Sequence, residues 1–227
     1  MKNKIEHLRS KISLSNRLEN KKINDVLKWL NKKDKINKMK VEKVSVNKMK
    51  DWFYKKNGNL VHKSGQFFSV EGVKVKSAKE REISDWEQPI LNQKHGGILA
   101  ILMRERNKII EFLLFARKEP GDNKIKLCPS FSATQSNINL AHGGKKTPLY
   151  EIILAKKKKI IGETIHYEEG ARFWKKSNWN VIVNLNNPYD KRIKGGNYMW
   201  ASLKQIKKLA LKNRYVNPFV KTILFIL

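Results

Sequence analysis

Two apolar segments near the middle of the chain constrain its fold more than any other feature. Gly97 to Met103 and Ile109 to Phe115 are almost entirely aliphatic or aromatic, and only the polar stretch from Arg104 to Lys108 separates them. Apolar runs of this length are typical of buried strands, and a short polar connection between two of them favours a hairpin. The sequence therefore predicts a buried β-hairpin.

Shorter patterns on both sides of this hairpin predict further strands. The alternation of apolar residues over Gln66 to Val75, with Gly72 in its middle, indicates either a pair of strands or one bulged strand. Asn57-Gly58 is a turn signal before it, and Ile160-Ile161 and Val181 to Leu185 are strand-like.

The C-terminal part carries two helix signals. From Ser202 to Leu211 the apolar residues recur at helical spacing, and Ser202 is suited to cap the first turn. Asn217 followed by Pro218 is typical of the start of a helix. Several strands with a few flanking helices make the expected fold class α+β.

The first 50 residues are rich in lysine and asparagine. Ile23, Val26, Leu27 and Leu30 fall on one helical face, with Asn20 or Asn24 near a cap position. Two alternatives are open here: a helical arm that packs on the body or on a second subunit, and a partly disordered tail. We divide the chain into an N-terminal arm, residues 1–50, and a single module, residues 51–227.

The chain is strongly basic, with 49 lysines and arginines, 20 aspartates and glutamates, and a formal net charge of +29. Such a charge ordinarily indicates nucleic acid or an anionic surface as the partner. However, lysine far outnumbers arginine, and asparagine and isoleucine are abundant, which is the mixture that AT-rich codons produce. Nucleic acid binding is therefore the weakest of our hypotheses, and a diphosphate ligand would benefit from the same positive field.

Cysteine content and the two termini bear on the location of the protein. The single cysteine, Cys128, excludes an internal disulfide and gives no spacing for a metal site, which suits a reducing compartment. The basic N-terminus lacks the apolar run of a signal peptide, and the apolar segment from Thr222 is too short to span a membrane. We expect a cytoplasmic protein that does not enter a membrane.

Three short polar islands interrupt the apolar pattern: Trp86 to Ile90, Lys118 to Gly121 and Ala133 to Asn137. They offer amides, hydroxyls, a carboxylate and rigid prolines rather than the periodic apolar residues of a strand or helix. Polar groups held by proline and glycine suit a preorganised pocket for a polyhydroxylated ligand. We therefore predict that these segments form a ligand site and not part of the scaffold.

Two more segments complete an ordered set, with His62 to Phe68 upstream of the islands and Glu168 to Phe173 downstream. In this order, the segments resemble the NDP-hexose 2,3-dehydratase family of deoxysugar biosynthesis, from about Trp52 to the C-terminus. The resemblance implies a Nudix-like fold, in which a mixed sheet lies between helices. Proteins of this family usually carry two such modules. Because each motif occurs once here, we expect a single module that forms a homodimer.

The resemblance also implies the substrate, an NDP-4-keto-6-deoxyhexose, with a dTDP-sugar as the first choice. A base removes the proton on carbon 3, which the neighbouring ketone acidifies, and the hydroxyl on carbon 2 then leaves. This elimination needs a base, a donor to the enolate oxygen and an acid, but neither a metal nor a redox cofactor. The Glu-rich, magnesium-binding helix of Nudix hydrolases has no counterpart in this sequence, which argues against a metal-dependent diphosphatase.

Two glutamates are candidates for the catalytic base. Pro120-Gly121 forces a turn that would hold the carboxylate of Glu119 at a strand end, although the same carboxylate could instead cap the backbone amides of that turn. Glu168 is the rival, because the family has Ser-Glu-Gln-Gly where residues 167–170 are Tyr-Glu-Glu-Gly. Its alternative is a solvated ion-pair cluster with Arg172.

Two residues are candidates for the acid that protonates the leaving hydroxyl. His142 titrates near neutrality and Tyr150 is a persistent donor. For His142 the alternative is a purely structural hydrogen bond. His62 has the same two alternatives, and we assign it to substrate binding.

The island at Ala133 contains the other expected ligand contacts. Thr134, Ser136 and Asn137 match the family's Ala-Thr-Arg-Ser-Asn and would hydrogen-bond the ligand; the alternative is a local turn network. Gln135 stands where the family has arginine, which removes a bidentate phosphate clamp.

Arg117, Arg172 and Lys175 are then the remaining phosphate partners, and Trp86 and Gln88 could stack on or bond to the base or sugar. Amides of the family's motifs are also missing at residues 114–117 and 128–134. The losses leave a second hypothesis open: a non-catalytic nucleotide-sugar-binding module, or a partner subunit of a full-length dehydratase.

Overall fold

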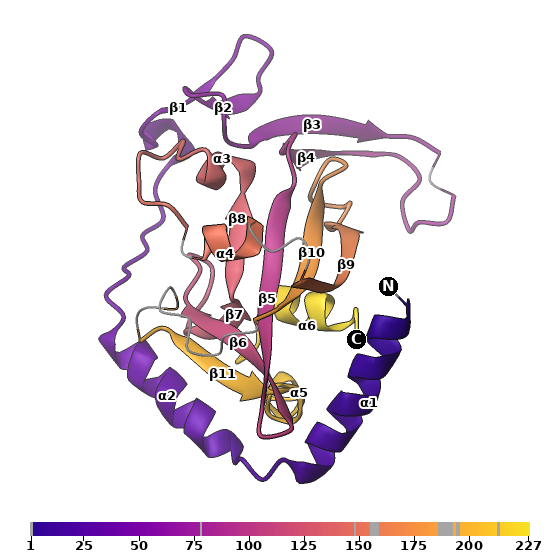
Figure 1. Cartoon of the computed structure of the whole chain (residues 1–227). Coiled ribbons are helices and arrows are strands. Elements are labelled where there is room, and N and C mark those ends of the chain that lie inside the picture. Colours follow the sequence, from indigo (N-terminus) through magenta and orange to yellow (C-terminus); the bar gives the residue numbers. More distant parts are fainter. Residues whose placement is uncertain are drawn as a thin grey trace.

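The computed structural model describes residues 2–77, 79–147, 149–154, 159–185, 193, 196–212 and 214–227. The strands form a four-stranded sheet near one end of the molecule and a seven-stranded sheet in its body (Figure 1). The helices α1 (Lys2–Leu18) and α2 (Ile23–Ile36) form a V around the opposite end.

The predicted hairpin is confirmed and lies at the centre of the larger sheet. Strand β5 (Gly97–Arg106) pairs with β6 (Ile109–Arg117), and the last pair joins Arg106 to Ile109. The two loop residues, Asn107 and Lys108, have positive φ angles of 51° and 63°. This is the backbone conformation of a two-residue type I′ turn, whose twist matches that of the flanking strands.

The larger sheet has the order β11-β6-β5-β10-β9, with β7 paired to β6 and β8 paired to β5. Strands β5 and β10 are parallel and the other pairs are antiparallel, so the sheet is mixed. The strands outside the hairpin are β7 (Lys126–Pro129), β8 (Phe131–Thr134), β9 (Ile160–Tyr167), β10 (Ser177–Asn184) and β11 (Tyr198–Ser202). The strands predicted at Ile160 and Val181 are thus confirmed.

Strands β5 and β6 diverge, and β7 and β8 fill the fork between them. The first four residues of β5 pair with β8, whereas the last four of β6 pair with β7. Ser130 connects β7 to β8 and is buried. Its hydroxyl accepts a hydrogen bond from the backbone N–H of Leu102 at 2.9 Å and donates to the carbonyl of Leu113. One serine therefore satisfies the backbone of both strands where their pairing ends.

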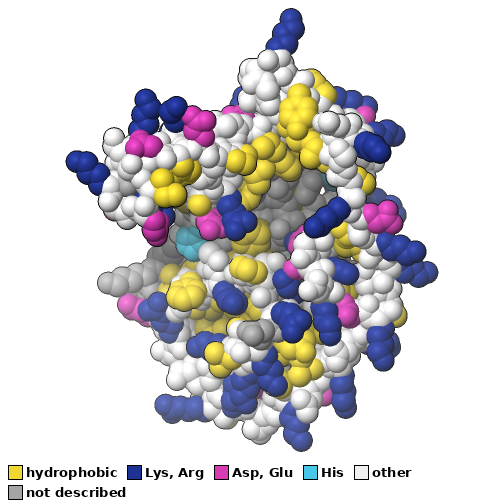
Figure 2. Space-filling view, turned by 180° about the vertical axis from the view of Figure 1, so that it is seen from behind, with side chains coloured by type: hydrophobic (Ala, Val, Ile, Leu, Met, Phe, Trp, Pro, Cys, Tyr) yellow, Lys and Arg dark blue, Asp and Glu magenta, His cyan; other side chains and the backbone are white. Residues whose placement is uncertain are grey.

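Positive charge is spread over the surface of this body. Figure 2 shows lysine and arginine side chains scattered across one whole face rather than gathered into a single patch.

Both faces of the central strand are buried. Leu99, Ile101 and Met103 belong to one apolar cluster, and the alternate residues Ala100 and Leu102 belong to another on the opposite face. Because side chains alternate across a strand, burial on both faces requires a continuous apolar run.

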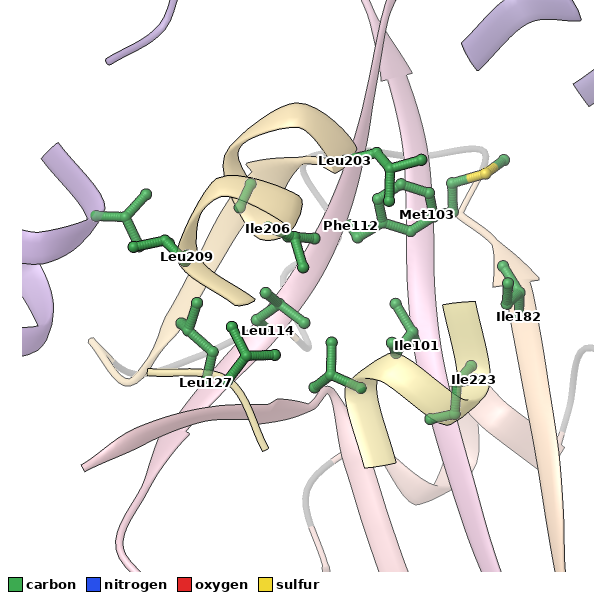
Figure 3. Close-up of a cluster of buried hydrophobic side chains, with 14 of the residues drawn as sticks. Ile101, Met103, Phe112, Leu114, Leu127, Ile182, Leu203, Ile206, Leu209 and Ile223 are labelled. Atoms are coloured by element: carbon green, nitrogen blue, oxygen red, sulfur yellow. The ribbon is translucent and has the colours of Figure 1, made fainter. Parts of the chain in front are cut away.

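Helices cover the two faces unequally. The first cluster includes residues of α1, α2, α5 (Leu203–Ala210) and α6 (Pro218–Leu224), as the side chains in Figure 3 show for α5 and α6. The second cluster is covered by α4 (Tyr150–Leu154). A mixed sheet between helices is the arrangement expected of the module, and the α+β class is confirmed.

The N-terminal segment takes the helical alternative over residues 2–36. Leu8 and Ile12 of α1 and Val26 and Leu30 of α2 are buried in the first cluster, so both helices pack on the body. The cap prediction is wrong, because Lys22 occupies the N-cap of α2 and its side chain makes no cap hydrogen bond. The boundary between arm and module stays a prediction.

Both C-terminal helix starts are confirmed. Ser202 and Gln205 form a reciprocal capping box at the start of α5, and the Asn217 side chain accepts from the Phe219 N–H at 2.9 Å before α6. These caps depend on neighbouring residues only, which is why the sequence predicts them.

The smaller sheet corrects two expectations. It contains β1 (Trp52–Tyr54), β2 (Leu60–His62), β3 (Ser69–Val75) and β4 (Trp86–Asn92), in that order and all antiparallel. The predicted turn at Asn57-Gly58 joins β1 to β2. The segment predicted as a strand pair or bulged strand is one regular strand, β3, in unbroken register with β4.

The island at Trp86 is therefore a strand and part of the scaffold. Its strand β4 lies at the edge of the sheet, where apolar alternation is not required and proline is tolerated. The N–H of Leu91 points away from β3 and bonds the carbonyl of Arg172 at 2.8 Å. Two residues earlier, Pro89 has the same orientation, so its missing N–H removes no ladder bond.

None of the helices in the described ranges has both the length and the apolar character that a membrane crossing requires.

Candidate functional site

A cavity of about 290 Å³ lies at the open end of the fork, where β5 begins and β6 ends. It is near the lower end of the roughly 300–1,000 Å³ range of ligand pockets. Its polar wall comes from four parts of the chain and consists of Arg117, Glu119, Ser132, Thr134, Asn137, Glu168, Lys176 and Asn178. The fold therefore brings both candidate bases to one cavity, which we call the small cavity.

Glu119 enters the small cavity from the turn that follows β6. Its carboxylate bonds the guanidinium of Arg117, with 2.6 Å between Oε1 and Nη2, and its side chain is 43% exposed. The carboxylate that bonds the turn's backbone is that of Asp122, which accepts from the Glu119 N–H at 3.3 Å. The geometry thus gives the capping role to Asp122 and leaves the Glu119 carboxylate facing the cavity.

Glu168 is more enclosed than Glu119. Its Oε1 accepts from Asn178 Nδ2 at 2.6 Å and lies 3.6 Å from Lys176 Nζ, and the Glu168 and Lys176 side chains are only 14% and 9% exposed. The solvated ion pair in this segment is formed by its neighbour Glu169, which pairs with Arg172 at 3.0 Å on the open surface. Glu168 therefore belongs to the cavity wall and not to that surface pair.

Asn178, the second residue of β10, orients Glu168. Its Oδ1 accepts from the Gly97 N–H at 2.8 Å while its Nδ2 donates to Glu168. A Cβ on Gly97 would lie 3.0 Å from Asn178 Oδ1 and 3.0 Å from the carbonyl oxygen of Ala133. Glycine at this position thus lets β5, β8 and β10 approach closely beside the cavity.

Lys176 and Asn178 were not among the predicted site residues. The expected phosphate partner in this segment is Lys175, but Lys175 is exposed and its ammonium lies 5.2 Å from the centre of the Trp174 ring. Lys176 lines the cavity. Lys175 has a positive φ angle of 49°, so strand alternation does not extend back from β10 to these two lysines. The sequence carries no signal for this change of backbone direction.

The Thr134 segment combines the two alternatives proposed for it. Thr134 caps α3 (Gln135–Ile138), because its hydroxyl accepts from the Asn137 N–H at 3.4 Å, and it lies 2.8 Å from the Ser136 hydroxyl. Thr134 and Asn137 also line the small cavity. The local turn network therefore exists, and it presents two of its members to the cavity.

The other predicted site residues do not line the small cavity. His142 accepts from the N–H of Gly144 at 2.8 Å in an exposed turn, and Tyr150 packs on the second apolar cluster. Trp86 and Gln88 bond each other at 2.8 Å, and Gln88 donates to the carbonyl of Ala171. These contacts are local or structural. Neither His142 nor Tyr150 is among the residues that surround the two carboxylates in the small cavity.

A second and larger cavity, of about 610 Å³, lies between the smaller sheet and α3. His62 lines it from the end of β2, with Nδ1 2.8 Å from the Ser64 hydroxyl and its ring edge-on to Phe67. Gln135 and Ser136 line it from α3. We call it the large cavity; apart from His62 and Ser136, the residues around it were not predicted as site residues.

Cys128, the single cysteine, is buried in β7. Burial raises the pKa of the Cys128 thiol to about 11, so this thiol stays protonated near neutral pH. The part of the chain that the structure describes contains no group of three or more His, Cys, Asp or Glu side chains placed to hold a metal ion. The independence of metals stays a prediction.

Comparison with known proteins identifies the family of this chain. The model of the family described as NDP-hexose 2,3-dehydratase matches residues 23–227. The chain belongs to this family. The match begins with α2, well before Trp52, so α2 is part of the matched region although we expected it in a separate arm.

Two curated members of the family are both called dTDP-4-dehydro-6-deoxy-alpha-D-glucopyranose 2,3-dehydratase. The one from Amycolatopsis orientalis is 32% identical over 88% of this chain and 43% of its own length. The one from Saccharopolyspora spinosa is 31% identical over 86% of this chain and 40% of its own length. The chain thus spans less than half the length of these relatives.

Among solved structures, the crystal structure of C. elegans Ap4A hydrolase matches 58% of this chain and 93% of its own, with 19% identity and a TM-score of 0.35. The fold class stated above rests on the sheets and helices of this chain.

Proposed function

We propose that this chain removes water across carbons 2 and 3 of an NDP-4-keto-6-deoxyhexose, with a dTDP-sugar as the substrate. Membership of the family and the names of the relatives support this proposal. The observation that carries it is the convergence of Glu119 and Glu168 on one small cavity, each beside a cation.

The small cavity offers a group for each step of the elimination. A carboxylate takes the proton from carbon 3, and the electron pair moves onto the ketone oxygen at carbon 4 as an enolate. The ammonium of Lys176 or the guanidinium of Arg117 stabilises that oxygen. The enolate then reforms the ketone and expels the hydroxyl from carbon 2, which leaves as water because the carboxylate passes it the proton taken from carbon 3. The resulting enol at carbon 3 becomes a ketone, giving a 3,4-diketo-2,6-dideoxy sugar.

Turnover of dTDP-4-keto-6-deoxyglucose tests the proposal. The product is trapped or reduced and its mass is compared with that of the substrate, in buffer that contains EDTA. Loss of one water is the expected result, and unchanged turnover in EDTA is expected because the ketone alone acidifies the proton. Recovery of intact substrate after prolonged incubation with folded protein contradicts the proposal.

A specific observation favours the second candidate, a non-catalytic nucleotide-sugar-binding module or partner subunit. Both carboxylates of the small cavity are already engaged, Glu119 by Arg117 and Glu168 by Asn178 and Lys176. Each carboxylate must part from these partners before it can bond a substrate atom. Binding of the nucleotide sugar without loss of the carbon 2 hydroxyl, in the same assay, identifies this alternative.

We also infer that the protein is a cytoplasmic homodimer. Each motif of the family occurs once in this chain, and a twofold dimer would bring two modules together by an isologous contact. Sedimentation at micromolar concentration is expected to give the mass of a dimer, and a monomer at that concentration excludes it.

A further inference from the structure

The large cavity adjoins the small one through a shared wall. Thr134 and Asn137 face the small cavity, whereas Gln135, Ser136 and Asn139 face the large one. A second link is the connection between β4 and β5, since residues 92–95 line the large cavity and Gly97 lines the small one. A ligand that occupies the small cavity with one end is thus placed to extend along α3 into the large cavity.

The large cavity has the charge that an anionic ligand requires. Lys55, Lys63 and Lys94 line it. Lys63 is already paired with Asp51 at 2.8 Å, whereas Lys55 and Lys94 form no ion pair with a described carboxylate. These two ammonium groups are therefore available to phosphate oxygens, and they compensate for the arginine that Gln135 replaces.

The rest of the large cavity is suited to the uncharged part of a nucleotide. Phe53 and Phe67 provide aromatic surface, on which a nucleobase can stack. Glu71 accepts from the Ser69 hydroxyl and from Asn92 Nδ2, and both bonds end on its Oε1. Its other oxygen, Oε2, is thus the acceptor for a ligand N–H or hydroxyl, and a phosphate placed there would be repelled.

We propose that the large cavity binds the nucleoside diphosphate half of the substrate, with the diphosphate at Lys55 and Lys94 and the nucleoside at Glu71 and the two phenylalanines. This assignment rests on the proposed function, because it places the sugar in the small cavity. It gives each cavity one half of the ligand, and it makes Glu71 and Lys94 specificity-determining residues that contact the same molecule at opposite ends.

The test is calorimetric titration with dTDP, which lacks the sugar and so reports on the large cavity alone. Lys94→Gln is expected to weaken binding about tenfold and to reduce its dependence on salt, since one charge-assisted contact is lost. Glu71→Gln is expected to weaken binding about fivefold, because the nucleoside loses a charged acceptor. The matched controls are Lys28→Gln and Glu87→Gln, two exposed residues outside both cavities, and they should bind dTDP as the unmodified protein does.

Whether Glu71→Gln weakens or tightens dTDP binding decides which end of dTDP lies beside Glu71. If the diphosphate lay at Glu71, removing the carboxylate would relieve repulsion and tighten binding, which would overturn the assignment. Absence of dTDP binding, or affinities in the two cavity variants equal to those of the controls, also overturns it. A parallel turnover assay distinguishes failure of the cavity assignment from failure of the proposed function. If only the assignment were wrong, the unmodified protein would still turn over its substrate. Tight dTDP binding without turnover would refute catalysis alone.

Discussion

Glu119 and Glu168 line the same cavity in different surroundings. Glu119 is partly solvated and bonded to one arginine, whereas Glu168 is enclosed and held by an amide and an ammonium. A carboxylate that is enclosed and held by two partners is less free to reach a substrate carbon than one that is partly exposed and bonded to a single side chain. At the scale of single residues, this difference favours Glu119 as the base and Glu168 as a positioning residue.

Glu119→Gln is expected to lower kcat by about two to four powers of ten and to leave the affinity for the nucleotide sugar nearly unchanged, because the basic carboxylate is lost but the shape is kept. Single-turnover kinetics and calorimetry measure the two quantities. Glu168→Gln is the parallel variant, and a larger fall in kcat for it would reverse the assignment.

Lys176→Met is expected to lower kcat about a hundredfold, because it removes the positive charge beside the developing enolate. Lys175→Met is the matched control: it changes the preceding, exposed lysine and should keep full activity. Thermal unfolding of both variants is measured alongside. A loss of stability in Lys176→Met with normal kcat per folded molecule would assign Lys176 a structural role only.

At the scale of elements, a buried ion-pair network joins the N-terminal helices to the central hairpin. Glu111 of β6 is 1% exposed and bonds Arg104 of β5 at 2.7 Å and Lys21, which lies between α1 and α2. Arg104 also lies over the ring of Trp200, 4.1 Å from its centre. Burial by itself raises the pKa of Glu111, but the hydrogen bonds from Lys21 and Arg104 outweigh it and lower the pKa below its ordinary value of 4.5.

Glu111→Gln is expected to reduce the free energy of unfolding by about 3–5 kcal/mol, because Arg104 is left buried without its counter-charge. Glu105→Gln is the matched control on the same hairpin. Its carboxylate pairs with Lys11 on the surface, so the change should stay within about 0.5 kcal/mol. Urea unfolding measures both.

The same pair of variants gives a pH test. A lowered pKa in the folded state means that Glu111 stabilises the protein above its unfolded-state pKa and that this contribution is lost as the pH falls through the folded-state pKa. Stability of the unmodified protein should therefore fall more steeply below about pH 4.5 than that of Glu111→Gln. Parallel acid curves for the two proteins would contradict this role.

At the scale of the whole molecule, the chain carries a net charge of +29, and on the face seen in Figure 2 its lysines and arginines are not gathered into one patch. The lysines are scattered over the face seen in Figure 2, and the charged site that the fold does build is a cavity, not a groove. Positive charges that are dispersed over a surface attract any polyanion weakly, and they do not hold the protein at one position along a duplex.

Binding to duplex DNA or RNA, measured by fluorescence anisotropy, is therefore expected to fall steeply with added salt and to disappear near physiological ionic strength. Single-stranded DNA of equal charge is the control and should behave alike. Tight duplex binding that survives physiological salt would restore nucleic acid as the partner.

The sequence by itself determined the features that depend on neighbouring residues. The apolar runs of β5 and β6 must be buried wherever the chain places them, and Ser202 and Asn217 cap helices with groups two or three residues away. The ordered motifs likewise identified the family, because motif order is a property of the chain and not of its folding.

Only the tertiary structure decided which of these residues share a site. Glu119 and Glu168 are far apart in sequence and line one cavity because β5 and β6 diverge, and Lys176 rather than Lys175 lines that cavity with them. The strand at Trp86 forms because an edge of the small sheet accepts its proline and polar residues. Each of these outcomes depends on contacts between distant segments, and local side-chain preferences do not encode those contacts.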